Sequence, residues 1–133
     1  MTDTRTAART WGDTWKQGWE ALDADLIVGL YAESITYSSE PFREVYRGRD
    51  GVRAYVEGSF ADEADVRAWF GEPVVEGERA SVSWWATLVD TGEEVTLAGT
   101  SVLRFDADGL AVDQWDTWNV VAGRREPPGG WGR

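Results

Sequence analysis

The chain of 133 residues has the length of one domain, and its 42% apolar content and nine tryptophans indicate a folded core. A formal net charge of −11 argues against binding to nucleic acid or to an anionic membrane surface. Because His and Cys are absent, acid–base chemistry falls to Asp, Glu or Tyr, and thiolate nucleophiles, disulfides and imidazole metal ligands are excluded.

No apolar run approaches the length of a membrane span, and residues 1–10 lack the apolar core of a signal peptide. Together with the absence of Cys, this predicts a cytoplasmic protein. The chain also lacks a D-x-D-x-D-G calcium loop, and we expect neither a metal nor a cofactor.

The first predicted element is an amphipathic helix over residues 4–22. Apolar side chains recur there at steps of three and four, which marks one helical face: Ala8, Trp11, Trp15, Trp19 and Leu22. Lys16, the only lysine, falls on the polar side of this helix. A Schiff-base mechanism would need that lysine in a pocket, so this class of chemistry is disfavoured.

Two more helices and a short strand are expected before residue 61. Residues 26–32 predict a second helix, and the β-branched, alternating residues 34–39 predict a strand. Residues 52–60 predict a third helix after the glycine-rich turn at 48–51. The polar residues 61–65 follow and are expected to form a solvated loop, with the carboxylates of Asp62, Glu63 and Asp65 in water.

The second half of the chain predicts a β-meander. Turn residues separate four runs rich in β-branched and aromatic side chains, at residues 66–75, 80–90, 95–105 and 109–121. Helices followed by long antiparallel strands give an α+β fold. Three N-terminal helices can cover only one face of the sheet, which predicts a curved antiparallel sheet that forms a cone with an internal pocket.

The last strand decides which side chains enter that pocket. Alternation along a strand puts Gln114, Asp116 and Trp118 on one face, and Trp115 and Thr117 on the other. Large rings on both faces indicate that both faces are covered. We expect the helices to cover the inner face and a second copy of the chain to cover the outer face.

Several phrases resemble the nuclear transport factor 2-like superfamily, which includes ketosteroid isomerases, limonene epoxide hydrolase and SnoaL-like polyketide cyclases. They are W-x3-W-x3-W with D-A-D-L-I-V-G-L-Y-A-E-S, then Y-R-G-R-D-G-V-R-A-Y, A-S-V-S-W-W-A-T, L-A-G-T-S-V-L-R-F-D-A-D-G and the closing D-x-W. The resemblance spans about residues 5–122. It implies a single SnoaL-like domain over 1–133, a cystatin-like α+β roll, with residues 123–133 as an irregular C-terminal tail.

The same resemblance argues against two of the superfamily's reactions. The carboxylate base of the ketosteroid isomerases falls on Ser39, and their two oxyanion-hole groups fall on Trp15 and Ser101. Serine cannot abstract a proton next to a carbonyl unaided. The Arg–Asp spacing of limonene epoxide hydrolase recurs at Arg104 and Asp106, but these residues run into a turn and lie out of phase with the inner face. The SnoaL-like cyclases, with an acid–base Asp in a late strand, fit better.

The facing implied by the resemblance gives a pocket lined mostly by aromatic residues: Trp15, Tyr37, Ser39, Tyr55, Phe60, Trp84, Ser101 and Trp118, with Ile35, Val82 and Leu103 beside them. Such walls suit a small hydrophobic ligand. The alternative is that these rings meet and fill the cone as core. Glu40 and Arg43 are either gate residues at the pocket rim or solvated loop charges.

Asp116 is the candidate catalytic residue, and two interpretations of it stay open. A lone carboxylate against Trp84 and Trp118 has its pKa raised by desolvation and is suited to proton transfer. A structural Asp116 instead pairs with Arg67, or with the hydroxyls of Tyr37 or Ser39, and its pKa is lowered.

Three functions follow from these alternatives. The first is a SnoaL-like enzyme that performs general acid–base catalysis on a hydrophobic carbonyl compound. The second is a non-catalytic binding module for an aromatic or terpenoid-like ligand, and the third is a protein-interaction domain with a filled cone. In each case we expect a homodimer through the outer sheet face, where Trp85 and Trp115 would be exposed in a monomer.

Overall fold

The computed structural model describes residues 1–133 and begins with the predicted amphipathic helix, α1 (Thr4–Ala21). Asp3 caps its N-terminus, because the Asp3 side chain accepts a hydrogen bond from the backbone N–H of Thr6. The helix ends where Leu22 adopts a left-handed conformation with φ of 53°. Its buried face presents the tryptophan stripe to the sheet, as the spacing predicted.

Helix α2 (Ala24–Val28) is shorter than the sequence predicted, and strand β1 (Tyr31–Ser38) begins earlier. The predicted helix over 26–32 is therefore wrong at its end, where Tyr31 lies in β1. A helix of five residues has little stability of its own, so nothing favours its extension to residue 32. The extended chain instead pairs with the last strand, in which Ala111 donates its N–H to the carbonyl of Leu30.

A short strand β2 (Tyr46–Arg47) leads into helix α3 (Gly48–Phe60). The remaining strands are β3 (Glu63–Phe70), β4 (Val74–Glu76), β5 (Arg79–Asp90), β6 (Glu93–Phe105) and β7 (Ala111–Ala122). The predicted strand over 66–75 is thus two strands, separated around Pro73, which has no N–H to donate. The predicted loop at 61–65 is wrong from Glu63 onward, since Glu63 pairs with Asp90 of β5.

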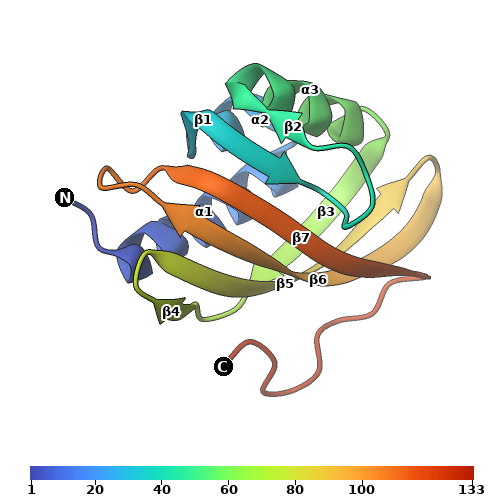
Figure 1. The fold of residues 1–133 in the computed structure, drawn as a ribbon. Helices are drawn as coiled ribbons and strands as arrows, with labels where there is room; N and C mark the ends of the chain where they lie inside the picture. The colour runs from blue at the N-terminus through green and yellow to red at the C-terminus, as the bar shows by residue number, and fades with distance from the viewer.

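These strands form one curved sheet in the order β2-β1-β7-β6-β5-β3, with β4 paired to β5 (Figure 1). The α+β architecture is confirmed. The pair β1–β7 is parallel whereas the other pairs are antiparallel, so the sheet is mixed.

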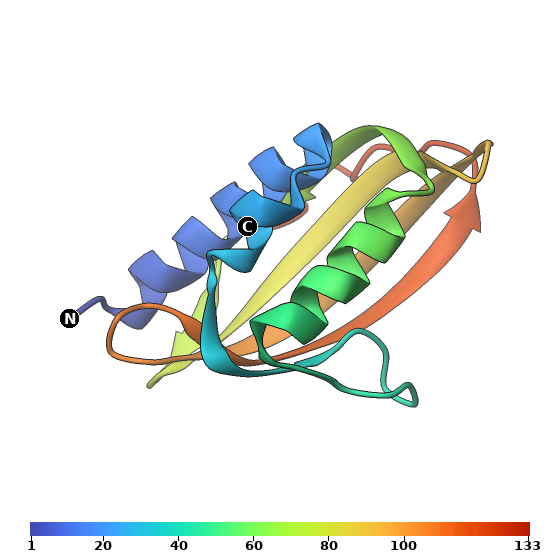
Figure 2. The ribbon, with the colours of Figure 1, turned by 90° about the horizontal axis from the view of Figure 1, so that it is seen from above.

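The three helices lie on the concave side of the sheet. Helix α1 packs over β3 and β5, and α3 packs over β1 (Figure 2). None of these helices combines the length and apolarity needed to cross a bilayer.

Alternation along β7 follows the predicted facing. Asp116 is 7% exposed and faces the helices, whereas Trp115 is 43% exposed on the opposite face. The register sets Asp116 opposite Ser101 and Trp118 opposite Gly99 on β6. A polar and an aromatic part of the inner wall therefore lie next to each other.

The tail after β7 has no helix or strand, and it returns across the outer face of the sheet (Figure 1). The indole of Trp85 donates to the carbonyl of Arg125 at 2.7 Å, and the Trp131 ring packs edge-on against it at 6.2 Å. Trp85 is therefore half-buried within one chain. The prediction that Trp85 is exposed in a monomer is therefore wrong, because the C-terminal tail of the same chain, and not a second chain, covers this side chain.

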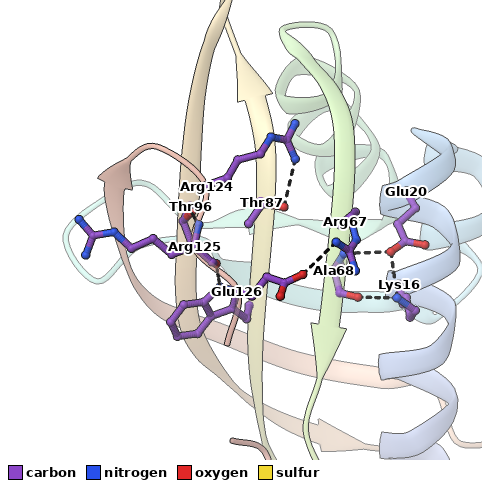
Figure 3. Close-up of polar contacts among 10 residues, drawn as sticks. Lys16, Glu20, Arg67, Ala68, Thr87, Thr96, Arg124, Arg125 and Glu126 are labelled. Carbon is purple, nitrogen blue, oxygen red and sulfur yellow. Dashed lines mark hydrogen bonds and ion pairs between the residues drawn. The ribbon is translucent and has the colours of Figure 1, made fainter. Parts of the chain in front are cut away.

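Arg67 belongs to this tail contact as well. Its guanidinium donates to Glu126 at 3.2 Å on the outer side, and Arg124 reaches the hydroxyl of Thr87 nearby (Figure 3). Arg67 is therefore not the partner of Asp116.

Candidate functional site

A cavity of about 350 Å³ lies between the helices and the inner face of the sheet. Its lining includes Asp116 and seven of the eight predicted pocket residues: Trp15, Tyr37, Tyr55, Phe60, Trp84, Ser101 and Trp118. The eighth, Ser39, is buried outside the lining, where its backbone carbonyl accepts the indole N–H of Trp118 at 2.8 Å. Its role is to orient that ring.

Asp116 lies in this cavity wall with three neutral hydrogen-bond donors. Ser101 donates to Oδ1 at 2.6 Å, Gln114 donates to the same oxygen at 3.0 Å, and Tyr37 donates to Oδ2 at 3.1 Å. The predicted contact with Tyr37 is present, whereas Ser101 takes the place suggested for Ser39. No arginine or lysine contributes, so the carboxylate carries its charge without a counter-ion.

Behind Asp116 the hydrogen bonds all run in one direction. The indole N–H groups of Trp11 and Trp15 can only donate, and they donate to the hydroxyl of Tyr31 at 3.3 and 3.0 Å. Tyr31 then donates to Oε1 of Gln114 at 2.5 Å, which leaves the amide nitrogen of Gln114 to donate to Asp116. The indoles of α1 thus fix the side chain that supports the carboxylate.

Burial and hydrogen bonding act on the pKa of Asp116 in opposite directions. Desolvation is the larger effect and raises the pKa from 3.8 to about 6, although the bonds from Ser101, Gln114 and Tyr37 each lower it. Burial likewise raises the pKa of the Tyr37 hydroxyl, and the neighbouring charge of Asp116 adds to this. Tyr37 therefore remains a donor, and the pKa of Asp116 lies closer to neutral pH than that of an ordinary Asp.

A second carboxylate, Glu63, enters the cavity at the start of β3. Its Oε1 accepts the indole N–H of Trp19 at 2.7 Å. Burial, reinforced by the charges of Asp90 and Asp62, raises the pKa of Glu63 from 4.5 to about 7. The predicted solvated position is wrong, because β3 starts at Glu63 and directs this side chain inward.

The lining also contains Glu40 and Arg43, whose side chains form an ion pair at 3.3 Å. Both residues thus belong to the cavity wall, in the loop where the sequence allowed either gate residues or solvated charges. Every buried side-chain nitrogen and oxygen has a hydrogen-bond partner. No three acidic side chains come together as a set of metal ligands.

The sequence did not predict several residues that line or support the cavity. Trp19 follows Trp15 on the same helical stripe, and Gln114 shares the inner face with Asp116, so both signals were present. Tyr31 was missed because it was assigned to a helix. Glu63 carried no signal, since its inward direction depends on a strand boundary that local sequence does not mark.

Comparisons with known proteins agree with this architecture. Residues 13–114 match the family model described as a SnoaL-like domain. No curated protein matched the chain significantly.

Solved structures with the same fold align over most of the chain. An epoxide hydrolase/cyclase-like enzyme, SalBIII, studied for pyran ring formation in the polyether salinomycin, aligns with a TM-score of 0.78 at 17% identity, over 92% of this chain and all of its own. A Mycobacterium tuberculosis protein aligns with a TM-score of 0.77 at 14% identity, over the same shares. An NTF2-like protein of unknown function from Exiguobacterium aligns with a TM-score of 0.71 at 19% identity, over 86% of this chain and 98% of its own.

Proposed function

The chain belongs to the SnoaL-like domain family of the NTF2-like superfamily, and we propose that it is a small-molecule enzyme that uses Asp116 for proton transfer. Its substrate is a hydrophobic carbonyl compound that enters the aromatic cavity. The observation that carries this proposal is the environment of Asp116: a buried carboxylate in the cavity wall with three neutral donors and no counter-ion.

The pKa of Asp116 suits this role. With a pKa of about 6, the carboxylate outnumbers the acid by about ten to one at pH 7. It is then ready to take a proton from a carbon next to a carbonyl, and the acid formed is strong enough to return it. The C–H electron pair passes into the enolate, and the proton passes to an oxygen of Asp116.

Tyr37 and Ser101 hold the carboxylate in place for this transfer, because each donates to one of its oxygens. Tyr55 brings another hydroxyl to the cavity from α3. Burial raises its pKa to about 12, which keeps the phenol protonated and able to donate to the substrate's carbonyl oxygen. Trp84 and Trp118 provide flat apolar surface for the rest of the substrate.

Proton exchange in deuterium oxide tests this function without knowledge of the natural substrate. A panel of hydrophobic aromatic and terpenoid ketones is incubated with the protein, and the signals of protons next to the carbonyl are followed by NMR. We expect enzyme-dependent exchange for at least one ketone and its loss in Asp116→Asn, because an amide cannot carry the proton. Asp108→Asn, in an exposed turn, is the matched control and keeps the exchange.

A non-catalytic binding module is the second candidate, and one observation favours it. Every buried polar side-chain atom, including both oxygens of Asp116, already has a partner within the protein. Ketones that quench tryptophan fluorescence but show no enzyme-dependent exchange would support this candidate and contradict the enzymatic one.

A further inference from the structure

We propose that Glu63 is a specificity-determining residue that binds a positively charged amine of the ligand in the part of the cavity that Asp62 and Asp90 also line. The ligand class is then an aromatic or polycyclic compound that carries an ammonium group. This inference rests on the proposed function only in that both use the same cavity; it requires no proton transfer by Asp116.

The lining of the cavity is rich in carboxylates. Five carboxylates line the cavity, and the single cationic side chain there, Arg43, is paired with Glu40. Glu63 takes part in none of the ion pairs in the structure. A half-buried carboxylate without a counter-ion favours a ligand that supplies one.

The C-terminal end of helix α3 contributes to the same cavity wall as Glu63. Helix α3 ends at Phe60, and both Ser59 and Phe60 line the cavity together with Glu63. The last carbonyl groups of a helix carry a partial negative charge, which favours a cation close by. The end of helix α3 and the carboxylate of Glu63 therefore both attract a positively charged ligand group.

An aromatic wall connects Glu63 with Asp116. Trp19 donates its indole N–H to Glu63 at 2.7 Å and packs edge-on against Trp84, with ring centroids 5.8 Å apart. Trp84 in turn donates to Ser101, which donates to Asp116. Two touching indoles thus join the two carboxylates, and they provide an apolar wall for the body of the ligand between them.

The resulting ligand spans the cavity with its two ends in different environments. A carbonyl end lies at Asp116, an apolar body lies along the Trp19–Trp84 wall, and an amine lies at Glu63. An anionic ligand group beside Glu63 is disfavoured, because Asp62 and Asp90 add to the negative charge there.

Three probes of similar shape test the charge preference: 4-phenylbutylamine, 4-phenylbutan-1-ol and 4-phenylbutanoate. Their affinities are measured by tryptophan fluorescence and calorimetry at pH 8 and low salt. We expect the amine to bind about tenfold more tightly than the alcohol, the size of one close charge interaction. The butanoate is expected to bind most weakly.

Glu63→Gln is expected to reduce the amine preference to near unity while the alcohol binds as before. Glu76→Gln removes the same charge from an exposed position on β4 and is expected to leave the preference unchanged. The preference in the wild type is also expected to fall at pH 6, where Glu63 becomes protonated and the amine stays charged. Asp62, Asp90 and Tyr55 lie around Glu63, and Asp116 lies in the wall of the same cavity. Because the pKa of Asp116 is about 6, this carboxylate also gains protons between pH 8 and pH 6. The pH comparison is therefore repeated in Asp116→Asn, where the amine preference is expected to fall at pH 6 as in the wild type.

Equal affinities for amine and alcohol, an undiminished preference in Glu63→Gln, or the absence of binding by all three probes would each overturn the proposal. Asp116→Asn separates it from the proposed function. If Asp116→Asn keeps the amine preference and the wild type exchanges no ketone protons, Glu63 has its assigned role and only the proton transfer by Asp116 fails.

Discussion

Asp116 is a residue at which burial outweighs hydrogen bonding. Three donors would normally hold a carboxylate in its charged form, yet none of them carries a positive charge. Desolvation therefore raises the pKa above its value in the unfolded chain. A structural Asp in an ion pair has the opposite shift, so the sign of the shift separates the two roles.

This sign predicts how stability depends on pH. Below pH 3.8 Asp116 is protonated in both states, and its stabilising effect is fully present. As the pH rises to about 6 the unfolded chain releases its proton first, so the free energy of unfolding falls. A rise of about two units in the pKa of Asp116 corresponds to a loss of roughly 3 kcal/mol in the free energy of unfolding as the pH rises from below both pKa values to above them.

Asp116→Asn is therefore expected to be more stable than the wild type at pH 7.5, by ~1–2 kcal/mol after the weaker hydrogen bonds of an amide are subtracted. Urea unfolding of both proteins at pH 7.5 and pH 4.5 measures the difference, which is expected to shrink at pH 4.5. An Asn variant that is clearly less stable at pH 7.5 would identify Asp116 as a structural residue.

At the scale of elements, strand β6 has one position at which only glycine fits. A Cβ at Gly99 would lie 2.5 Å from the carbonyl oxygen of Thr117, 2.6 Å from Cβ of Trp118 and 2.8 Å from the Trp84 ring. The register that sets Gly99 opposite Trp118 thus allows the two pocket tryptophans to approach the sheet closely.

Gly99→Ala is expected to lower the free energy of unfolding by ~1–3 kcal/mol, because β6 and the rings of Trp84 and Trp118 must move apart. The same movement is expected to reduce the affinity of the cavity for aromatic ligands. Gly58→Ala is the control: nothing lies within 4 Å of its Cβ, and an Ala in α3 is expected to gain ~0.5–1 kcal/mol. Thermal and urea unfolding compare them. A Gly99→Ala protein as stable as the wild type would contradict the packing described for this wall.

Elements with strong periodicity were predicted well, and elements set by long-range pairing were not. The stripe of α1 and the alternation of β7 each indicate one buried face, which carries Trp15 and Asp116 respectively. The facing implied by the resemblance then predicted the pocket residues on the other strands, such as Trp84. By contrast, the extended state of Tyr31 depends on pairing with β7, 80 residues later. The sequence likewise predicted a solvent-exposed Glu63, because the strand that contains Glu63 forms only by pairing with β5.

At the scale of the whole molecule, the C-terminal tail changes the outer face. It covers Trp85, so Trp115 is left as the large exposed ring there, with Arg79 stacked at 6.0 Å. A homodimer through this face remains our prediction, now with Trp115 at its centre and the docked tail at its side.

Light scattering at ~100 μM, where a micromolar dimer is formed, is expected to give the mass of two chains. Trp115→Asp places a charge at the expected centre of the interface and is expected to give the mass of one chain, with unchanged circular dichroism. A single chain mass for the wild type at that concentration would contradict the dimer.

NMR titration of carbon-13-labelled side-chain carboxyl groups tests most directly whether the cavity holds a carboxylate poised for proton transfer. The Asp116 signal is assigned by its absence in Asp116→Asn. We predict a midpoint near pH 6, well above the ordinary value of 3.8. A midpoint at or below pH 3.8 would contradict the claim and leave Asp116 as part of the structural hydrogen-bond network.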